Sequence, residues 1–138
     1  YYHIGIAVDT PQGLTVPVLK HADRMNLREI SAELARLSAA AREEKLTITD
    51  LQGASFTISS LGSIGGTNFT PLVSAPQAAI LGVAQVALKP IWDGQSFVPR
   101  LMLPFSLSYD HRIIDGAEAA RFCRTLRGFL EDLQRLLI

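Results

Sequence analysis

Two residues near the C-terminus have the types and the spacing that proton transfer needs. His111 follows the strand-like run 101–109, and Asp115, four residues later, stands before a glycine at the start of an amphipathic pattern. A histidine with an ordinary pKa of ~6.5 exchanges its proton near neutral pH, so His111 at a rigid strand end could act as a general base. The alternatives are an ordinary strand-end histidine and, for Asp115, a helix N-cap that also fixes the turn aiming His111.

Ser59 is a third candidate, at the end of the alternating run 54–59. Phe56 and Ile58 point to one side of this run, and its hydroxyl-bearing residues point to the other. No Gly-x-Ser-x-Gly pattern surrounds Ser59, which disfavours a nucleophile. A hydroxyl that donates to an oxyanion is the more natural role, and an ordinary strand serine is the alternative.

The sequence contains no pattern that predicts a metal-binding or a phosphate-binding site. The glycine-rich segment 61–67 lacks the Lys-Ser/Thr of a phosphate-binding loop and the spacing of a dinucleotide-binding one, so we interpret it as a turn. The three histidines have no metal-ligand spacing, and we expect no metal site. The single cysteine, Cys123, excludes an intrachain disulfide and lies in a helical pattern, where we expect a buried hydrophobic side chain.

Hydrophobic periodicity predicts the elements that must position these residues. We expect two long helices, several strands and two hairpins, one at the turn 10–13 and one at Asp93-Gly94. Asn26 and Glu29 form a capping-box pattern at the first helix, and Asp115 can cap the second. The predicted strands are 4–8, 14–19, 54–59, 78–86 and 101–109, and the predicted helices are 26–42 and 115–137.

The apolar positions define the faces that we expect to be buried. They are Leu27, Ile30, Leu34 and Leu37 in the first helix, Leu101, Leu103, Phe105, Leu107 and Tyr109 in the last strand, and Phe122, Leu126, Phe129, Leu130, Leu133 and Leu137 in the second helix.

Composition bounds the class of protein. The 138 residues suffice for one domain, 1–138, of α/β class. Thirteen basic and thirteen acidic residues cancel, so charge gives no case for binding nucleic acid or an anionic membrane. No apolar run approaches the ~20 residues of a membrane span. With 48% hydrophobic residues, we expect some apolar surface to be buried in an oligomer.

Three segments resemble one family, the dihydrolipoamide acyltransferases, which are the E2 components of 2-oxo acid dehydrogenase complexes. Residues 108–116 resemble the family's His-x-x-x-Asp-Gly signature, and residues 56–62 and 75–83 are similar to two other family blocks. The resemblance runs from Tyr1 to Ile138. Residues 90–94 and 99–104 are most similar to the bacterial pyruvate type, which makes acetyl the expected acyl group; succinyl or a branched-chain acyl group is the alternative.

The resemblance implies a chloramphenicol-acetyltransferase-like fold, a mixed sheet flanked by helices, of which this chain is a truncated copy. It also implies a homotrimer with active sites at subunit interfaces, trimers gathered into a cubic or dodecahedral core, and a place in the bacterial cytoplasm. The C-terminal residues 136–138 fit the family's trimer–trimer contacts.

The chemistry implied by the resemblance is acetyl transfer between dihydrolipoamide and coenzyme A, both of them substrates. His111 would remove the thiol proton, and Ser59 of the neighbouring subunit would stabilise the oxyanion. Asp115 matches a structural acid that pairs with an arginine near the N-terminus of the family's domain. Phe69 and Leu81 match residues that line the substrate pocket.

By the same resemblance, the chain corresponds to the C-terminal portion of the catalytic domain. The lipoyl domain and the peripheral-subunit-binding domain, which serve the E1 and E3 enzymes, are expected to be absent from it. An assembling but inactive core fragment is therefore the alternative function. Antibiotic O-acetyltransferases and peptide condensation domains of the same fold carry His-His, whereas Asp110 precedes His111 here and argues against both.

Overall fold

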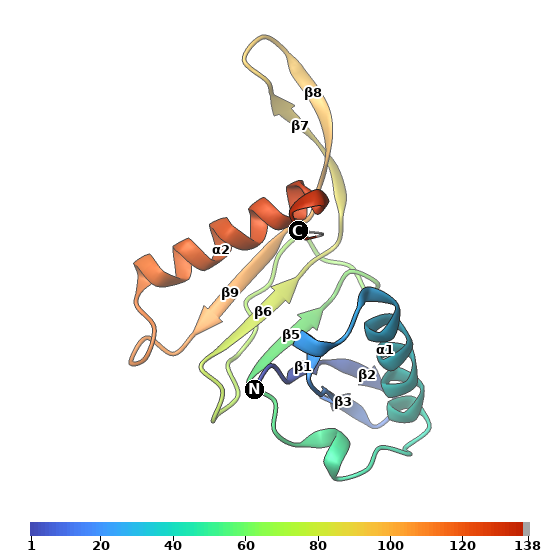
Figure 1. The fold of residues 1–138 in the computed structure, drawn as a ribbon. Helices are drawn as coiled ribbons and strands as arrows, with labels where there is room; N and C mark the ends of the chain where they lie inside the picture. The colour runs from blue at the N-terminus through green and yellow to red at the C-terminus, as the bar shows by residue number, and fades with distance from the viewer. Residues whose placement is uncertain (137–138) are drawn as a thin grey trace.

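A five-stranded mixed sheet forms the centre of the computed structural model, which describes residues 1–136 (Figure 1). The strand order is β4-β1-β5-β6-β9. The three central strands are parallel, and each edge strand is antiparallel to its neighbour. The strands are β1 (Ile4–Ile6), β4 (Val18–Leu19), β5 (Phe56–Ser60), β6 (Ala79–Val83) and β9 (Phe105–Tyr109).

Two hairpins stand outside this sheet: β2 (Val8–Thr10) with β3 (Gly13–Thr15), and β7 (Ala87–Trp92) with β8 (Phe97–Met102). Both predicted turns are thus confirmed. Figure 1 shows the β7–β8 hairpin projecting away from the rest of the chain.

Three predicted strands are each divided in two. The run 4–8 becomes β1 and the start of β2, and in the other two runs a proline lies at the division. The run 14–19 becomes β3 and β4 around Pro17, whose carbonyl accepts from the Ile6 N–H at 2.8 Å. The run 101–109 becomes the end of β8 and all of β9, with Pro104 between them. A proline has no N–H to donate to a ladder, so each strand changes its partner there.

The long helices begin at the predicted caps. In α1 (Leu27–Arg42), Asn26 Oδ1 accepts from the Glu29 N–H at 3.0 Å and Glu29 Oε2 accepts from the Asn26 N–H at 2.8 Å, which confirms the capping box. The predicted helix 115–137 is shorter, because α2 (Gly116–Glu131) gives way to the 3₁₀ helix η3 (Leu133–Leu136). Two further 3₁₀ helices are η1 (Ala22–Arg24) and η2 (Thr49–Leu51).

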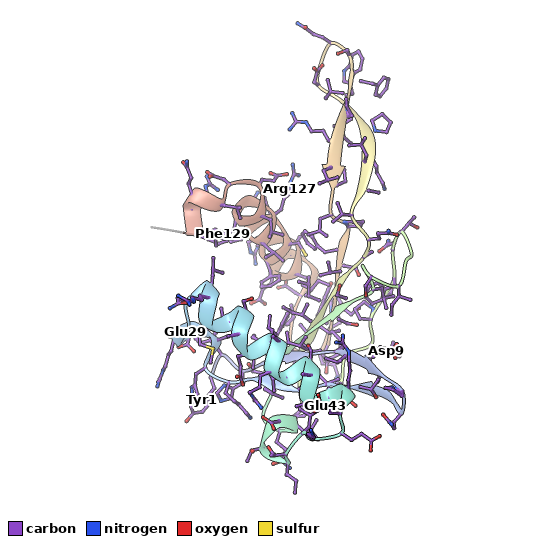
Figure 2. The ribbon with its side chains drawn as sticks, turned by 90° about the vertical axis from the view of Figure 1, so that its right-hand side faces the viewer. Tyr1, Asp9, Glu29, Glu43, Arg127 and Phe129 are labelled. Carbon is purple, nitrogen blue, oxygen red and sulfur yellow. The ribbon has the colours of Figure 1, made fainter. Side chains whose placement is uncertain are left out.

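The long helices do not cover one of the two faces of β5 and β6. The Phe122 ring of α2 lies 6.0 Å from the Phe56 ring of β5, and α1 packs against β2 and β4. Figure 2 places Glu29 and Glu43 at the two ends of α1, and Arg127 and Phe129 on α2. The opposite face of β5 and β6 borders a groove whose walls include part of the loop between these strands.

The core is smaller than the sequence predicts. Within α1, Leu37 is fully buried. Leu27 is 74% exposed, so the prediction that Leu27 belongs to the buried face is wrong. Leu101 and Leu103 are exposed because they precede β9 instead of belonging to it. The α2 stripe is also largely exposed, at Phe122, Phe129, Leu130 and Leu133, because nothing among residues 1–136 covers it; Leu137 lies outside the described residues.

Cys123 is only partly buried, not fully buried as predicted. Within residues 1–136, no helix has both the length and the apolar character needed to cross a bilayer.

Gly5 in β1 permits a close approach to β5. A Cβ added there would lie 2.6 Å from Thr57 Oγ1 and 3.0 Å from Val16 Cγ1. We therefore expect Gly5→Ala to destabilise the fold by about 1–3 kcal/mol, as overpacking does. Urea unfolding measures this, and the cost should shrink in a Thr57→Ala background, where Oγ1 is gone. An equal cost in both backgrounds would contradict the packing argument.

Asp50 in η2 fastens the segment after α1 to that helix. Its carboxylate accepts from the Thr47 hydroxyl at 2.7 Å, from the Thr47 N–H at 2.9 Å and from the Arg36 guanidinium at 3.0 Å. The hydroxyl bond first, then the other two, lower the pKa of Asp50 to about 2.

Since folding depresses this pKa, the stabilisation is complete above the ordinary aspartate pKa of ~3.9 and is lost as pH falls toward 2. Arg36 is half exposed, so solvent screens its contribution. We expect Asp50→Asn to cost about 1 kcal/mol of unfolding free energy at pH 7 and less at each step from pH 4 to pH 2.5. Urea titrations at these pH values check it, and a pH-independent difference would show that ionisation of Asp50 plays no part.

Candidate active site

His111 lies in a short turn between β9 and α2 and is exposed. The turn is anchored at its start, where the Asp110 N–H donates to the Ala78 carbonyl at 2.8 Å and extends the ladder between β6 and β9. The His111 ring lies 5.6 Å from the ring of Tyr109, the last residue of β9. The predicted base is therefore tied to a sheet strand and open to an incoming group.

Asp115 ends the same turn. Its carboxylate accepts from the Glu118 N–H at 2.8 Å, so it is the N-cap of α2, as the sequence indicates. Gly116 follows it where α2 passes close to Tyr109, since an added Cβ would lie 3.6 Å from the tyrosine oxygen. The cap thus sets the direction in which the chain leaves His111.

Ser59 lies in β5 and lines a groove of about 740 Å³ on the face that the helices do not cover. Thr57 precedes it on the same face, and Phe69 and Pro71 from the loop after β5 form part of the wall. Among the lining residues, most are apolar and few are polar, which is the usual composition of a site for a small organic group.

Of the two predicted pocket residues, the structure brings only one to this groove. Phe69 is in its lining. Leu81 is buried, but it pairs with Leu107, which faces α2, whereas the adjacent Ile80 faces the groove. Because side chains alternate along a strand, Leu81 points away from the groove in this chain.

Ser59 and His111 do not meet within one chain. Ser59 is level with Gly82 of β6, which in turn is level with Ser106 of β9. Tyr109 is three residues further along β9, or about 10 Å, and His111 lies beyond it. Two strand spacings, about 10 Å, separate β5 from β9 across the sheet. A donor and a base must both come within about 3 Å of the reacting atoms, so Ser59 and His111 of the same chain cannot serve one reacting group.

Two features of the site were missed at the sequence level. Thr57, a residue that is 4% exposed, lines the groove, and its hydroxyl donates to Gln77 Oε1 at 2.6 Å. No sequence pattern predicts a hydrogen bond between residues twenty positions apart. Asp110 and Arg112, on either side of His111, form an ion pair at 2.6 Å. Opposite charges flanking a candidate base were a visible signal for that pair.

Among residues 1–136, no group of three or more His, Cys, Asp or Glu side chains lies close enough together to hold a metal ion.

Comparison with known proteins gives consistent matches over the whole chain. The family model of the 2-oxoacid dehydrogenases acyltransferase catalytic domain matches residues 1–138. The dihydrolipoyllysine-residue acetyltransferase component of the pyruvate dehydrogenase complex of Pseudomonas aeruginosa is 58% identical over 138 residues, which are all of this chain and 25% of that protein. The chain therefore spans about a quarter of the length of this curated relative.

Two solved structures have the same fold. One, of Azotobacter vinelandii dihydrolipoamide acetyltransferase, has a TM-score of 0.97 and 57% identity, covering 100% of this chain and 57% of that one. The other is the cubic core of a pyruvate dehydrogenase multienzyme complex, with a TM-score of 0.97, 56% identity and the same coverage.

The Azotobacter structure belongs to an investigation of a serine, a histidine and an asparagine in the catalytic mechanism of that enzyme. Those residues are 52 and 4 positions apart, as are Ser59, His111 and Asp115 here. At the third position the two chains differ, with an aspartate in place of an asparagine. Either side chain can accept the N-cap hydrogen bond that Asp115 makes.

Proposed function

The chain belongs to the 2-oxoacid dehydrogenase acyltransferase family, within the catalytic domain, and on that premise we propose that it transfers an acetyl group between coenzyme A and dihydrolipoamide. The observation that carries the proposal is the spacing of Ser59, His111 and Asp115, which equals that of the residues investigated in the Azotobacter enzyme. The 58% identity to an acetyltransferase component supports acetyl as the acyl group.

In the proposed reaction, His111 takes the proton of the attacking thiol. A thiol of ordinary pKa, ~8.5, is mostly protonated at neutral pH and is a weak nucleophile until the proton leaves. The thiolate then attacks the thioester carbonyl carbon, and the Ser59 hydroxyl donates to the resulting oxyanion. When the tetrahedral intermediate collapses, the departing thiolate takes the proton back from the His111 imidazolium.

We propose that each site joins His111 of one chain to Ser59 of another, in a homotrimer. The distance between the two residues within one chain supports this arrangement, as do the exposed apolar side chains of the β7–β8 hairpin and α2. Asp115 would hold the His111 turn as the cap of α2, and Phe69 would line the path of the acyl carrier.

The finer fold proposal is a chloramphenicol-acetyltransferase-like architecture, with trimers assembling into a larger core. The match to a cubic core supports a cubic assembly over a dodecahedral one. The full-length protein would act in the bacterial cytoplasm and engage the E1 and E3 enzymes and its lipoyl group through segments outside this match. Bacterial relatives of this kind support both points.

The test of the function is acetyl transfer from acetyl-CoA to dihydrolipoamide, followed as free coenzyme A thiol. His111→Ala should lower kcat by ~10²–10⁴, the range for a general base. Ser59→Ala should lower kcat by ~10²–10³. Matched controls are His21→Asn, which suits a left-handed backbone with φ of 52°, and Ser55→Ala. The Ser55 hydroxyl donates to the carbonyls of Tyr1 and His3 and lines the pocket beside α2 instead of the groove, so both variants should keep full activity.

If His111→Ala kept full activity, the assignment of His111 as the general base would be wrong. A folded, oligomeric wild-type chain without turnover would favour the inactive core fragment, and faster transfer from succinyl-CoA or a branched-chain acyl-CoA would change the acyl group.

Mixing the two inactive variants tests whether sites are shared between chains. His111→Ala and Ser59→Ala chains, unfolded together and refolded at equal amounts, should recover about a quarter of wild-type activity, because some interfaces then pair an intact histidine with an intact serine. The same variants refolded separately and then combined should stay inactive. If co-refolding recovers nothing while wild-type chains refold well, the two residues act within one chain.

A further inference from the structure

Asp110 and Arg112 hold each other across His111. The Arg112 Nε donates to Asp110 Oδ1 at 2.9 Å, and Nη2 donates to Oδ2 at 2.6 Å. The Arg112 backbone N–H also donates to Oδ1, at 3.0 Å. Nε also approaches Oδ2, at 3.2 Å, so one carboxylate accepts four bonds from three donors of the residue two positions ahead. The backbone of His111 lies between the two partners.

The backbone of Asp110 fixes this closed turn to the protein. Its N–H continues the β6–β9 ladder through Ala78, and its carbonyl accepts from the N–H groups of Ile113 and Ile114, each at 3.0 Å. Every polar group of Asp110 thus has a partner in the turn or in the sheet. These hydrogen bonds join residues on both sides of His111 and so restrain its backbone.

The location of the pair argues against a purely stabilising role. Arg112 is 89% exposed, and exposed ion pairs add little to folding free energy. The bonds from the Arg112 side chain, and then from its backbone, lower the pKa of Asp110 to about 2, so the carboxylate is charged near neutral pH. The pair is therefore intact across the pH range in which a histidine base works.

We infer that the Asp110–Arg112 pair is a positioning element that sets the direction of the His111 imidazole as it reaches toward the other chain. Neither side chain takes part in the chemistry; together they fix the backbone dihedrals on both sides of the base. The inference rests on the proposed acetyl transfer, since it concerns the residue to which that proposal assigns the base. Misplacing a reacting group by about 1 Å can cost on the order of 100-fold in rate.

The competing role for Arg112 is direct binding of an anionic part of the substrate, such as the phosphates of coenzyme A. That role would appear in the KM for acetyl-CoA and would need Arg112 but not Asp110. A positioning role appears in kcat, needs both residues, and leaves both KM values near those of the wild type.

The experiment is steady-state kinetics of Asp110→Asn, Arg112→Gln and Arg112→Lys in both substrates, with a thermal melt of each variant. We expect Asp110→Asn and Arg112→Gln each to lower kcat ~10- to 100-fold, with both KM values within about twofold of wild type and the melting temperature little changed. Arg112→Lys should recover part of the loss, because lysine keeps the charge but not the two-pronged contact. The double variant should be no slower than the worse single variant.

A matched control exists at the end of α1, where Lys45 and Glu43 form a pair with the same two-residue spacing and the same 2.6 Å separation. Glu43→Gln and Lys45→Gln should leave kcat unchanged.

The positioning role would be overturned if Asp110→Asn kept the wild-type kcat. It would also be overturned if Arg112→Gln, but not Asp110→Asn, raised the KM for acetyl-CoA. If kcat fell only in variants whose melting temperature also fell, the pair would contribute to folding and not to the position of His111. Lack of acetyl transfer by the wild type, or full activity of His111→Ala, would instead overturn the proposed function.

Discussion

The antiparallel pairing of β9 with β6 is the constraint on which the arrangement of the site depends. β5 and β6 run in parallel, so the C-terminal end of β5, with Ser59, lies at one end of the sheet. β9 runs the other way and delivers His111 to the opposite end. No rotamer change can bring the two side chains together, because the ladder hydrogen bonds fix the register. The joint action proposed for these residues would therefore need Ser59 and His111 from two different chains.

The exposed apolar surface is consistent with that requirement. Phe97 at 70% exposure and Leu101 at 73% belong to the β7–β8 hairpin, which projects away from the rest of the chain (Figure 1). Phe129 of α2 (Figure 2) and Leu133 of η3 are exposed as well. Large exposed apolar side chains in such number are typical of proteins that associate. Several side chains whose spacing predicts burial are among these exposed residues, which is why the core of one chain is smaller than the sequence predicts.

Local features were predictable from the sequence, and features that depend on partners were not. The capping box at Asn26, the cap at Asp115 and the two hairpin turns are set by a few neighbouring residues, and the structure confirms each of them. Periodicity identified the runs around Pro17 and Pro104 as strands but not their exchange of partners, because pairing is a long-range property. The side of the sheet that Leu81 faces depends on register in the same way. Residue types and spacing indicated His111, Asp115 and Ser59, and the resemblance added their expected roles together with Phe69 and Leu81. The separation of Ser59 from His111 became visible only once the strand directions were known.

In the arrangement proposed above, a base that acts in a neighbouring chain faces two opposing demands. It must be exposed enough to enter a neighbour's groove, yet exposed turns are usually the most mobile parts of a protein. Burial cannot supply rigidity to His111, so the turn must be held by its own bonds: the ladder through Asp110, the cap through Asp115 and the Asp110–Arg112 pair. Ser59 needs no such device, since it belongs to a sheet strand with partners on both sides. The dense bonding around one exposed histidine and the plain strand around the serine are therefore two solutions to the same problem of preorganisation.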